Sequence, residues 1–179
     1  MIQIILRKSL GYEGHNLDKL EKALEIMERV VNSELFQNKI LYYEFHYRKK
    51  LFGGAIDFPY TSSQVLEIIE NAVNYPGNTA PHTIDLYLEL LHGKNSRLAN
   101  NGQAPEKEIY IDKAQFEQMT SKQIANYLFH EWLHKLGFQH ARYNLPFNKR
   151  NQSVPYAVGY FIEELADRVK PSSPAEKSN

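Results

Sequence analysis

The spacing of apolar residues along the chain predicts alternating strands and helices. Apolar and β-branched residues at 2–7 predict a first strand. Apolar residues then recur at helical spacing over 17–31, which predicts a helix with Asn16 as its N-cap. The aromatic-rich segment 40–47 favours a second strand, which the glycine pair at 53–54 ends.

The rest of the chain continues this alternation. The hydroxyl-bearing residues 61–63 are typical helix caps, and the apolar residues that follow them up to Val73 recur at helical spacing. Segments 74–81 and 93–105 are rich in polar residues, glycine or proline, which is typical of turns and surface loops. The other predicted elements are strands at 83–91 and 108–112 and helices at about 121–137 and 155–169.

This order of elements predicts the α+β class, with a mixed β-sheet packed against helices. The length of 179 residues fits one domain over 1–170, which is large enough to bury a core without a disulfide or a structural metal. The tail 171–179 has no apolar side chain apart from one alanine and its prolines, so we expect it to be disordered.

Composition narrows the choice of partners. Lys and Arg together number 21, as do Asp and Glu, so the net charge favours neither nucleic acid nor an anionic membrane as a partner. We interpret the basic residues 48–50 as a solvated strand end, with a phosphate-contacting patch as the alternative. No segment has the pattern of a signal peptide or a membrane span, which predicts a cytoplasmic protein as the chain stands and leaves secretion open if a leader was removed.

The segment HEWLHKLGFQH at 130–140 matches H-E-x-x-H-x-x-G-x-x-H at every fixed position. His130 and His134 are one turn apart on the same face of a helix, so both can bind one metal ion. Gly137 can adopt a left-handed conformation that ends the helix and lets His140 reach the same ion. Because the chain has no cysteine, the ligands must be histidine or carboxylate, and three histidines favour Zn²⁺ with a fourth position open to water.

Glu131 is the predicted general base. It lies about 100° around the helix from His130, at the flank of the histidine face, where it can reach a water on the metal without binding the metal. Zinc lowers the pKa of such a water to about 7, and a carboxylate can take its proton and later protonate a leaving amine. A chance match to all five specified residues has odds on the order of one in tens of thousands.

The other side chains of the predicted helix are consistent with a buried element that opens one polar strip onto a cleft. Gln123 and Tyr127 lie on the side of His130 and His134, and Trp132 is interpreted as a core residue. The remaining arc is apolar and comprises Ile124, Ala125, Leu128, Phe129, Leu133 and Leu136. The histidines without ligand spacing, which we interpret as structural or solvated, are His15, His46, His82 and His92.

The motif at 130–140 resembles that of the metzincins, a group of zinc endopeptidases. The resemblance implies a zincin-like fold in which a mixed sheet lies over the active-site helix and a C-terminal helix follows. It also implies peptide or protein substrates that pair with an edge strand, here 83–91 or 108–112. The predicted function is therefore zinc-dependent peptide-bond hydrolysis.

The chain departs from the metzincin pattern because no methionine follows His140. The segment Ser153–Gly159 stands where the family has a methionine-containing turn beneath the zinc, and its Pro-Tyr pair could form an equivalent floor. Tyr156 has two interpretations at this position. Its hydroxyl could stabilise the oxyanion of the transition state, as a tyrosine does in some metzincins, or its ring could be a packing aromatic that opens the last helix.

Three alternatives remain open from the sequence. The segment 133–140 also resembles the zinc-binding segment of bacterial rRNA-maturation endoribonucleases, which have His-x₃-His-x₅-His spacing. That family typically has glycine at the position of Glu131, and the absence of net charge argues against RNA as substrate. The others are a non-catalytic zinc-binding module and an amidase that acts on a non-peptide substrate. The sequence makes no prediction about the oligomeric state.

Overall fold

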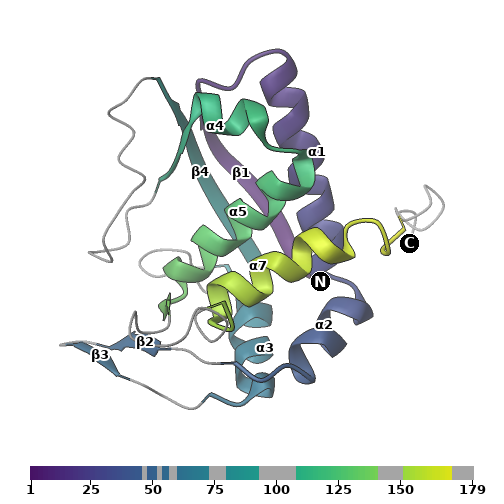
Figure 1. Cartoon of the computed structure of the whole chain (residues 1–179), viewed down its shortest axis with the longest axis vertical. Coiled ribbons are helices and arrows are strands. Elements are labelled where there is room, and N and C mark those ends of the chain that lie inside the picture. The colour runs from purple at the N-terminus through teal and green to yellow at the C-terminus, as the bar shows by residue number, and fades with distance from the viewer. Residues whose placement is uncertain are drawn as a thin grey trace.

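The computed structural model describes residues 1–45, 48–51, 54–56, 60–72, 80–92, 108–140 and 151–170, with the backbone alone for 48–51 and 54–56. In this part of the chain, helices pack against one face of a three-stranded parallel sheet (Figure 1). A second three-stranded sheet is antiparallel and receives a strand from the segment that follows the motif helix. No helix of the described residues is both long and apolar enough to cross a bilayer.

The parallel sheet consists of β1 (Gln3–Leu10), β4 (Thr83–Leu91) and β5 (Ile109–Asp112), with β4 in the centre. Alternate residues of β4 from Ile84 to Leu90 are buried, whereas the residues between them are partly exposed. This period of two gives the sheet one apolar face for the helices. An ion pair between Arg7 and Asp85, with 2.7 Å between Nε and Oδ1, links β1 to β4 on the other face.

Helix α1 (His15–Val31) follows β1, and its buried stripe includes Leu20, Met27 and Val30. Its C-terminal end is tied to β1, because the Asn32 side chain hydrogen-bonds both the N–H and the carbonyl of Ile2, at 2.7 and 2.8 Å. The two shorter helices α2 (Glu34–Leu41) and α3 (Ser62–Asn71) pack against each other. Side-chain caps begin both of them, Ser33 at α2 and Thr61 at α3.

Helices α4 (Lys113–Gln118) and α5 (Ser121–Lys135) follow β5, and α7 (Val154–Leu165) lies alongside α5 (Figure 1). Thr120 begins α5 with a capping box, in which its side chain accepts from the Gln123 N–H and the Gln123 side chain accepts from the Thr120 N–H. The apolar arc predicted for this helix is confirmed, because all of its residues and Trp132 are buried. Phe129 and Trp132 are in ring contact, with centroids 5.1 Å apart.

The antiparallel sheet has the order β3-β2-β6 and is formed by β2 (Arg48–Leu51), β3 (Gly54–Ile56) and β6 (Phe138–Gln139). Residues 48 and 49 of β2 pair with 139 and 138 of β6. The strand after α5 is therefore held by a segment almost a hundred residues earlier in the chain.

Most predicted elements are confirmed, and three details are wrong. Among the described residues, the single mixed sheet is instead two sheets: β1, β4 and β5 form a parallel sheet, and β2, β3 and β6 form an antiparallel one. Residues 40 and 41 of the strand predicted at 40–47 instead end α2, in which Phe36 and Ile40 are buried at helical spacing, and 42–45 are neither helix nor strand. Residues 46 and 47 lie outside the described residues, and the next strand begins at Arg48. Gly14, not Asn16, is the N-cap of α1. Of the two candidate edge strands, β4 is central and β5 lies at an edge of the described sheet, so 108–112 is the one that stays a candidate.

The α+β class is consistent with this arrangement, whereas the finer metzincin-like assignment stays a prediction. Three predictions concern residues outside the described part of the chain: the turn at 74–81, apart from its last two residues, the loop at 93–105, and disorder of the tail at 171–179.

Candidate metal centre

The three histidines of the motif meet at one point. His130 and His134 lie one turn apart on α5, and their Nε2 atoms are each 3.0 Å from Nε2 of His140. They form a group of potential metal ligands in the described part of the chain. Tetrahedral coordination at about 2.0–2.1 Å separates ligand nitrogens by about 3.3 Å, so the three rings lie close enough to bind a single ion.

Gly137 brings His140 back to the helix. Its φ of +92° lies in the left-handed region, and its N–H bonds the carbonyl of His134 at 3.0 Å. The chain then enters β6, where Phe138 is fully buried and pairs with Lys49 of β2. The predicted role of Gly137 as the turn after the helix is confirmed. That a second sheet holds the segment after it was not predicted.

Backbone carbonyls determine which ring nitrogens of the first two histidines carry protons. Nδ1 of His134 lies 2.7 Å from the carbonyl oxygen of Phe138, and because a carbonyl only accepts, Nδ1 is the donor. His130 hydrogen-bonds the backbone of Pro155, which has only a carbonyl to offer, so its Nδ1 is the donor and its Nε2 faces His140. In both neutral rings, Nε2 therefore presents a lone pair.

The environment keeps the three rings uncharged. Burial, together with repulsion by His134 and His140, lowers the pKa of His130 to about 3, although its bond to Pro155 acts in the opposite direction. Burial and the nearby His134 lower the pKa of His140 to about 4. Burial also lowers the pKa of His134. Neutral imidazole is the form of histidine that binds metal ions.

Glu131 lies on the adjacent strip of α5, between Tyr127 one turn before and Lys135 one turn after. Burial raises the pKa of the Glu131 carboxyl to about 7, and the charge of Lys135 opposes this shift. The pKa of the Tyr127 hydroxyl is raised by burial and by the nearby Glu131. That hydroxyl donates to the carbonyl of Tyr110 in β5 at 3.1 Å. The side of α5 that carries Glu131 is therefore hydrogen-bonded to the parallel sheet.

Tyr156 lies against two of the three histidines. Its ring stacks on His140, with centroids 4.5 Å apart and planes 22° apart, and contacts His130 edge-on at 4.7 Å. It belongs to the first turn of α7, next to Pro155. The segment that the sequence placed at the floor of the site therefore does contact the histidines, through a carbonyl and an aromatic ring.

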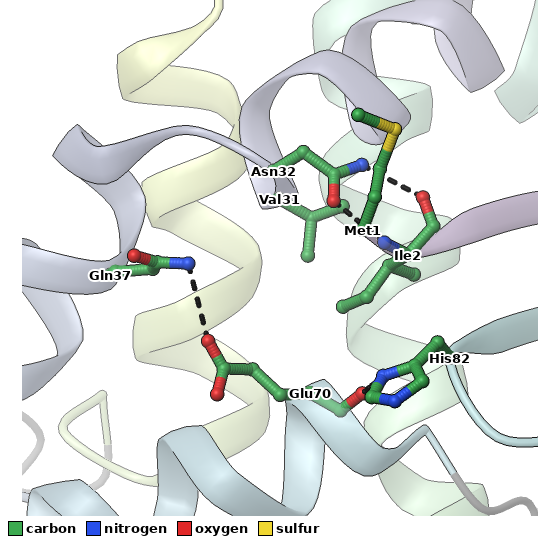
Figure 2. Close-up of a pocket in the computed structure, with 7 residues that line it drawn as sticks. All are labelled: Met1, Ile2, Val31, Asn32, Gln37, Glu70 and His82. Atoms are coloured by element: carbon green, nitrogen blue, oxygen red, sulfur yellow. Dashed lines mark hydrogen bonds between the residues drawn. The ribbon is translucent and has the colours of Figure 1, made fainter.

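His82 lies in a separate cavity of about 420 Å³ (Figure 2). Nδ1 of its exposed ring is 2.7 Å from the carbonyl of Glu70. The Glu70 side chain accepts from Nε2 of Gln37 at 3.2 Å. In the described part of the chain, neither His15, His82 nor His92 joins a group of metal ligands, and His46 lies outside the described residues.

Sequence analysis missed the residues that support the histidines. The carbonyls of Phe138 and Pro155 carry no side-chain signature, and the Tyr127–Tyr110 bond depends on how the sheet packs against α5. One signal was available. Thr120 and Gln123 have the spacing of a capping box and fix the start of α5 three turns before the first ligand.

Comparisons of this chain with models of known families, with curated proteins and with solved structures gave no match. The resemblance to metzincins therefore stays a prediction carried by residues 130–140. A function must be argued from the chemistry of the residues that meet at the site.

Proposed function

We propose that this protein is a zinc-dependent hydrolase that cleaves peptide bonds, with His130, His134 and His140 as metal ligands and Glu131 as general base. The observation that carries the proposal is the convergence of three Nε2 atoms. His140 can donate at most one proton, to His130 or to His134. In at least one of these two Nε2–Nε2 contacts, two nitrogen lone pairs therefore face each other at 3.0 Å. A bound cation would remove this repulsion.

The donor set suits zinc. Three neutral imidazoles bind Zn²⁺ in sites that keep one position open, whereas Ca²⁺ and Mg²⁺ prefer oxygen ligands. The hydrogen bonds from His130 and His134 to backbone carbonyls are the supporting contacts that metal-binding histidines typically make. A zinc ion bound there would supply Lewis acidity toward water and a substrate carbonyl.

Glu131 supplies the proton transfer in this proposal. The residue follows the first ligand directly, so its carboxylate leaves the helix at the flank of the metal-binding face. Hydrolysis of an amide needs a group that takes a proton from the attacking water and returns one to the leaving nitrogen. Glutamate can do both, whereas the glycine found here in the similar endoribonucleases cannot. Peptide hydrolysis is therefore favoured over RNA cleavage.

The experiment combines metal analysis with cleavage of a diverse peptide mixture, for wild type, Glu131→Gln and a control, Glu67→Gln. Glu67 is an exposed residue of α3. We expect about one equivalent of zinc in all three proteins. Cleavage should fall on the order of a hundredfold to ten-thousandfold in Glu131→Gln, which is the range for a lost general base, and should be unchanged in the control.

Each other outcome overturns a stated part of the proposal. Equal cleavage by Glu131→Gln and wild type removes Glu131 from the mechanism. A wild-type protein that carries no zinc, and takes up none when zinc is added, removes the metal centre. RNA cleavage without peptide cleavage assigns the site to the endoribonuclease class. Zinc uptake without cleavage of peptide, RNA or small amides assigns it to the non-catalytic modules.

A further inference from the structure

Helices α5 and α7 lie close together at Gly159. A Cβ atom on this residue would lie 2.6 Å from Oδ1 of Asn126, 3.1 Å from the carbonyl oxygen of Asn126 and 3.2 Å from Cβ of His130. Contacts below about 3.4 Å force neighbouring atoms to shift. The spacing of the two helices (Figure 1) therefore depends on glycine at a position that faces the first metal-ligand residue.

Polar contacts hold the two helices at this spacing. Asn126, one turn before His130, donates from Nδ2 to Oε2 of Glu163 at 2.8 Å, and Glu163 lies one turn after Gly159. Two turns before His130, Lys122 pairs with Asp167 just beyond the end of α7. These contacts join α5 and α7 from Lys122 to Asn126, and His130 follows one turn later.

The first turn of α7 reaches the histidines from this interface. Pro155 accepts the hydrogen bond of His130, and the Tyr156 ring contacts both His130 and His140. His140 differs from the other two ligands, because among the described residues it has no hydrogen bond to a backbone carbonyl. Among the described residues, Tyr156 is the aromatic ring that stacks on the His140 imidazole, whereas the rings of His130 and His134 meet it tilted or edge-on.

We propose that Gly159 and Tyr156 are positioning residues for the histidine cluster. Gly159 allows the close approach of α7, and the Tyr156 ring then holds the His140 imidazole in the orientation in which its Nε2 meets the other two. This inference rests on the metal-binding part of the proposed function. It assigns the effect of Tyr156 on metal binding to its ring and not to its hydroxyl.

The test is the affinity of the purified full chain for Zn²⁺, measured by competition with a chromophoric chelator, and the visible spectrum of the Co²⁺ form. Tyr156→Leu should bind Zn²⁺ about 10–100-fold more weakly than wild type, as is typical when contacts that orient a ligand are lost. Its Co²⁺ spectrum should change, because His140 is no longer held. Tyr156→Phe keeps the ring and should stay within about threefold of wild type.

Tyr160→Leu is the matched control. Tyr160 lies one turn further along α7 and is exposed, at 59% against 44% for Tyr156, but makes no ring contact with the histidines among the described residues. Its affinity should equal that of wild type. Thermal unfolding of the metal-free proteins, followed by circular dichroism, shows whether each variant folds.

Gly159→Ala tests the other half of the inference. We expect about tenfold weaker Zn²⁺ binding, because the added methyl group pushes α7 away from His130. If this variant does not fold, the tyrosine series alone decides. Equal affinity of Tyr156→Leu and wild type overturns the inference, and so does a loss in Tyr156→Phe as large as in Tyr156→Leu, which would assign the effect to the hydroxyl.

Peptide cleavage separates this inference from the proposed function. If wild type cleaves no peptide while the Zn²⁺ affinities follow the expected order, the peptidase proposal fails and the positioning role stands. If wild type cleaves peptides and Tyr156→Leu binds Zn²⁺ as tightly as wild type, the positioning role fails and the peptidase proposal stands. A wild type that binds no metal overturns both.

Discussion

The candidate metal centre and the cavity of Figure 2 both contain a histidine bonded to a backbone carbonyl, but only the candidate metal centre brings several histidines together. In both, a histidine directs Nδ1 at a backbone carbonyl 2.7 Å away: His134 at Phe138, and His82 at Glu70. Nε2 of His134 then faces a second imidazole at 3.0 Å. Among the described residues, His82 has no such partner. Both regions therefore contain a histidine whose tautomer is fixed by a carbonyl. What distinguishes the candidate metal centre is that the Nε2 atoms of several histidines meet there.

The two regions differ in what brings their residues together. At the metal centre, a helix supplies two histidines, a left-handed glycine returns the chain, and α7 supplies Tyr156. In the cavity, the Glu70 carboxylate is bonded to Gln37 and the His82 ring is exposed. Its polar groups therefore bond to neighbours and do not converge on one point. Four predictions test this difference.

The largest expected effect is on metal binding. His134→Ala removes one of the three proposed ligands, so Zn²⁺ affinity should fall by more than the roughly 100-fold that follows the loss of a supporting contact. His82→Asn is the control, because asparagine tolerates the φ of +59° at this position. Its affinity should stay within about twofold of wild type. Chelator competition measures both, and equal losses in the two variants would remove the distinction between the regions.

The second prediction concerns the helix on which the metal centre is built. Trp132 is fully buried on the face of α5 that carries no ligand. Trp132→Ala should lower the free energy of unfolding by about 3–5 kcal/mol, because it leaves a large cavity in the core. Urea unfolding of the metal-free protein measures this change. A loss below about 1 kcal/mol would show that the core does not support the ligand helix as the structure indicates.

The helices with clear apolar periodicity and caps could be predicted from the sequence. Helix α3 follows its Thr61 cap as expected, and the buried arc of α5 was predicted residue by residue. The strand predicted at 40–47 is wrong at its start. Its aromatic residues favour a strand locally, whereas the cap at Ser33 and the spacing of Phe36 and Ile40 favour a helix that ends at residue 41. The pairing of strands could not be predicted, because it depends on contacts distant in sequence.

The same limit applies to the candidate site. The three histidines and Gly137 belong to a local motif, and helix geometry is enough to bring them together. The Phe138 carbonyl depends on β2 pairing with β6, and Tyr156 depends on the spacing of α5 and α7 at Gly159. These contacts arise from tertiary packing, which a single sequence does not specify locally. The ligands could therefore be predicted, but the residues that orient them could not.

The third prediction concerns the structural role of the cavity. Asn32 bonds both backbone groups of Ile2 and also the carbonyl of Glu28, at 2.7–2.8 Å. Asn32→Ala should therefore cost about 1–3 kcal/mol of unfolding free energy, because backbone groups at the start of β1 lose their partner. Zn²⁺ affinity should not change. Urea unfolding and chelator competition on the same preparation give both values, and a large fall in affinity without a loss of stability would contradict this assignment.

The smallest effect is expected at Glu70, which tests whether the cavity needs its charge. In Glu70→Gln the new amide oxygen can still accept from Gln37, so the bond at 3.2 Å is kept and only the negative charge is lost. Because the side chain is half-buried and has no cationic partner among the described residues, unfolding free energy should change by about 0.5 kcal/mol or less. Zn²⁺ affinity should equal that of wild type. A tenfold change in Zn²⁺ affinity would mean that the Glu70 carboxylate affects metal binding from the cavity. The meeting of side chains at one point would then no longer distinguish the candidate metal centre from the cavity.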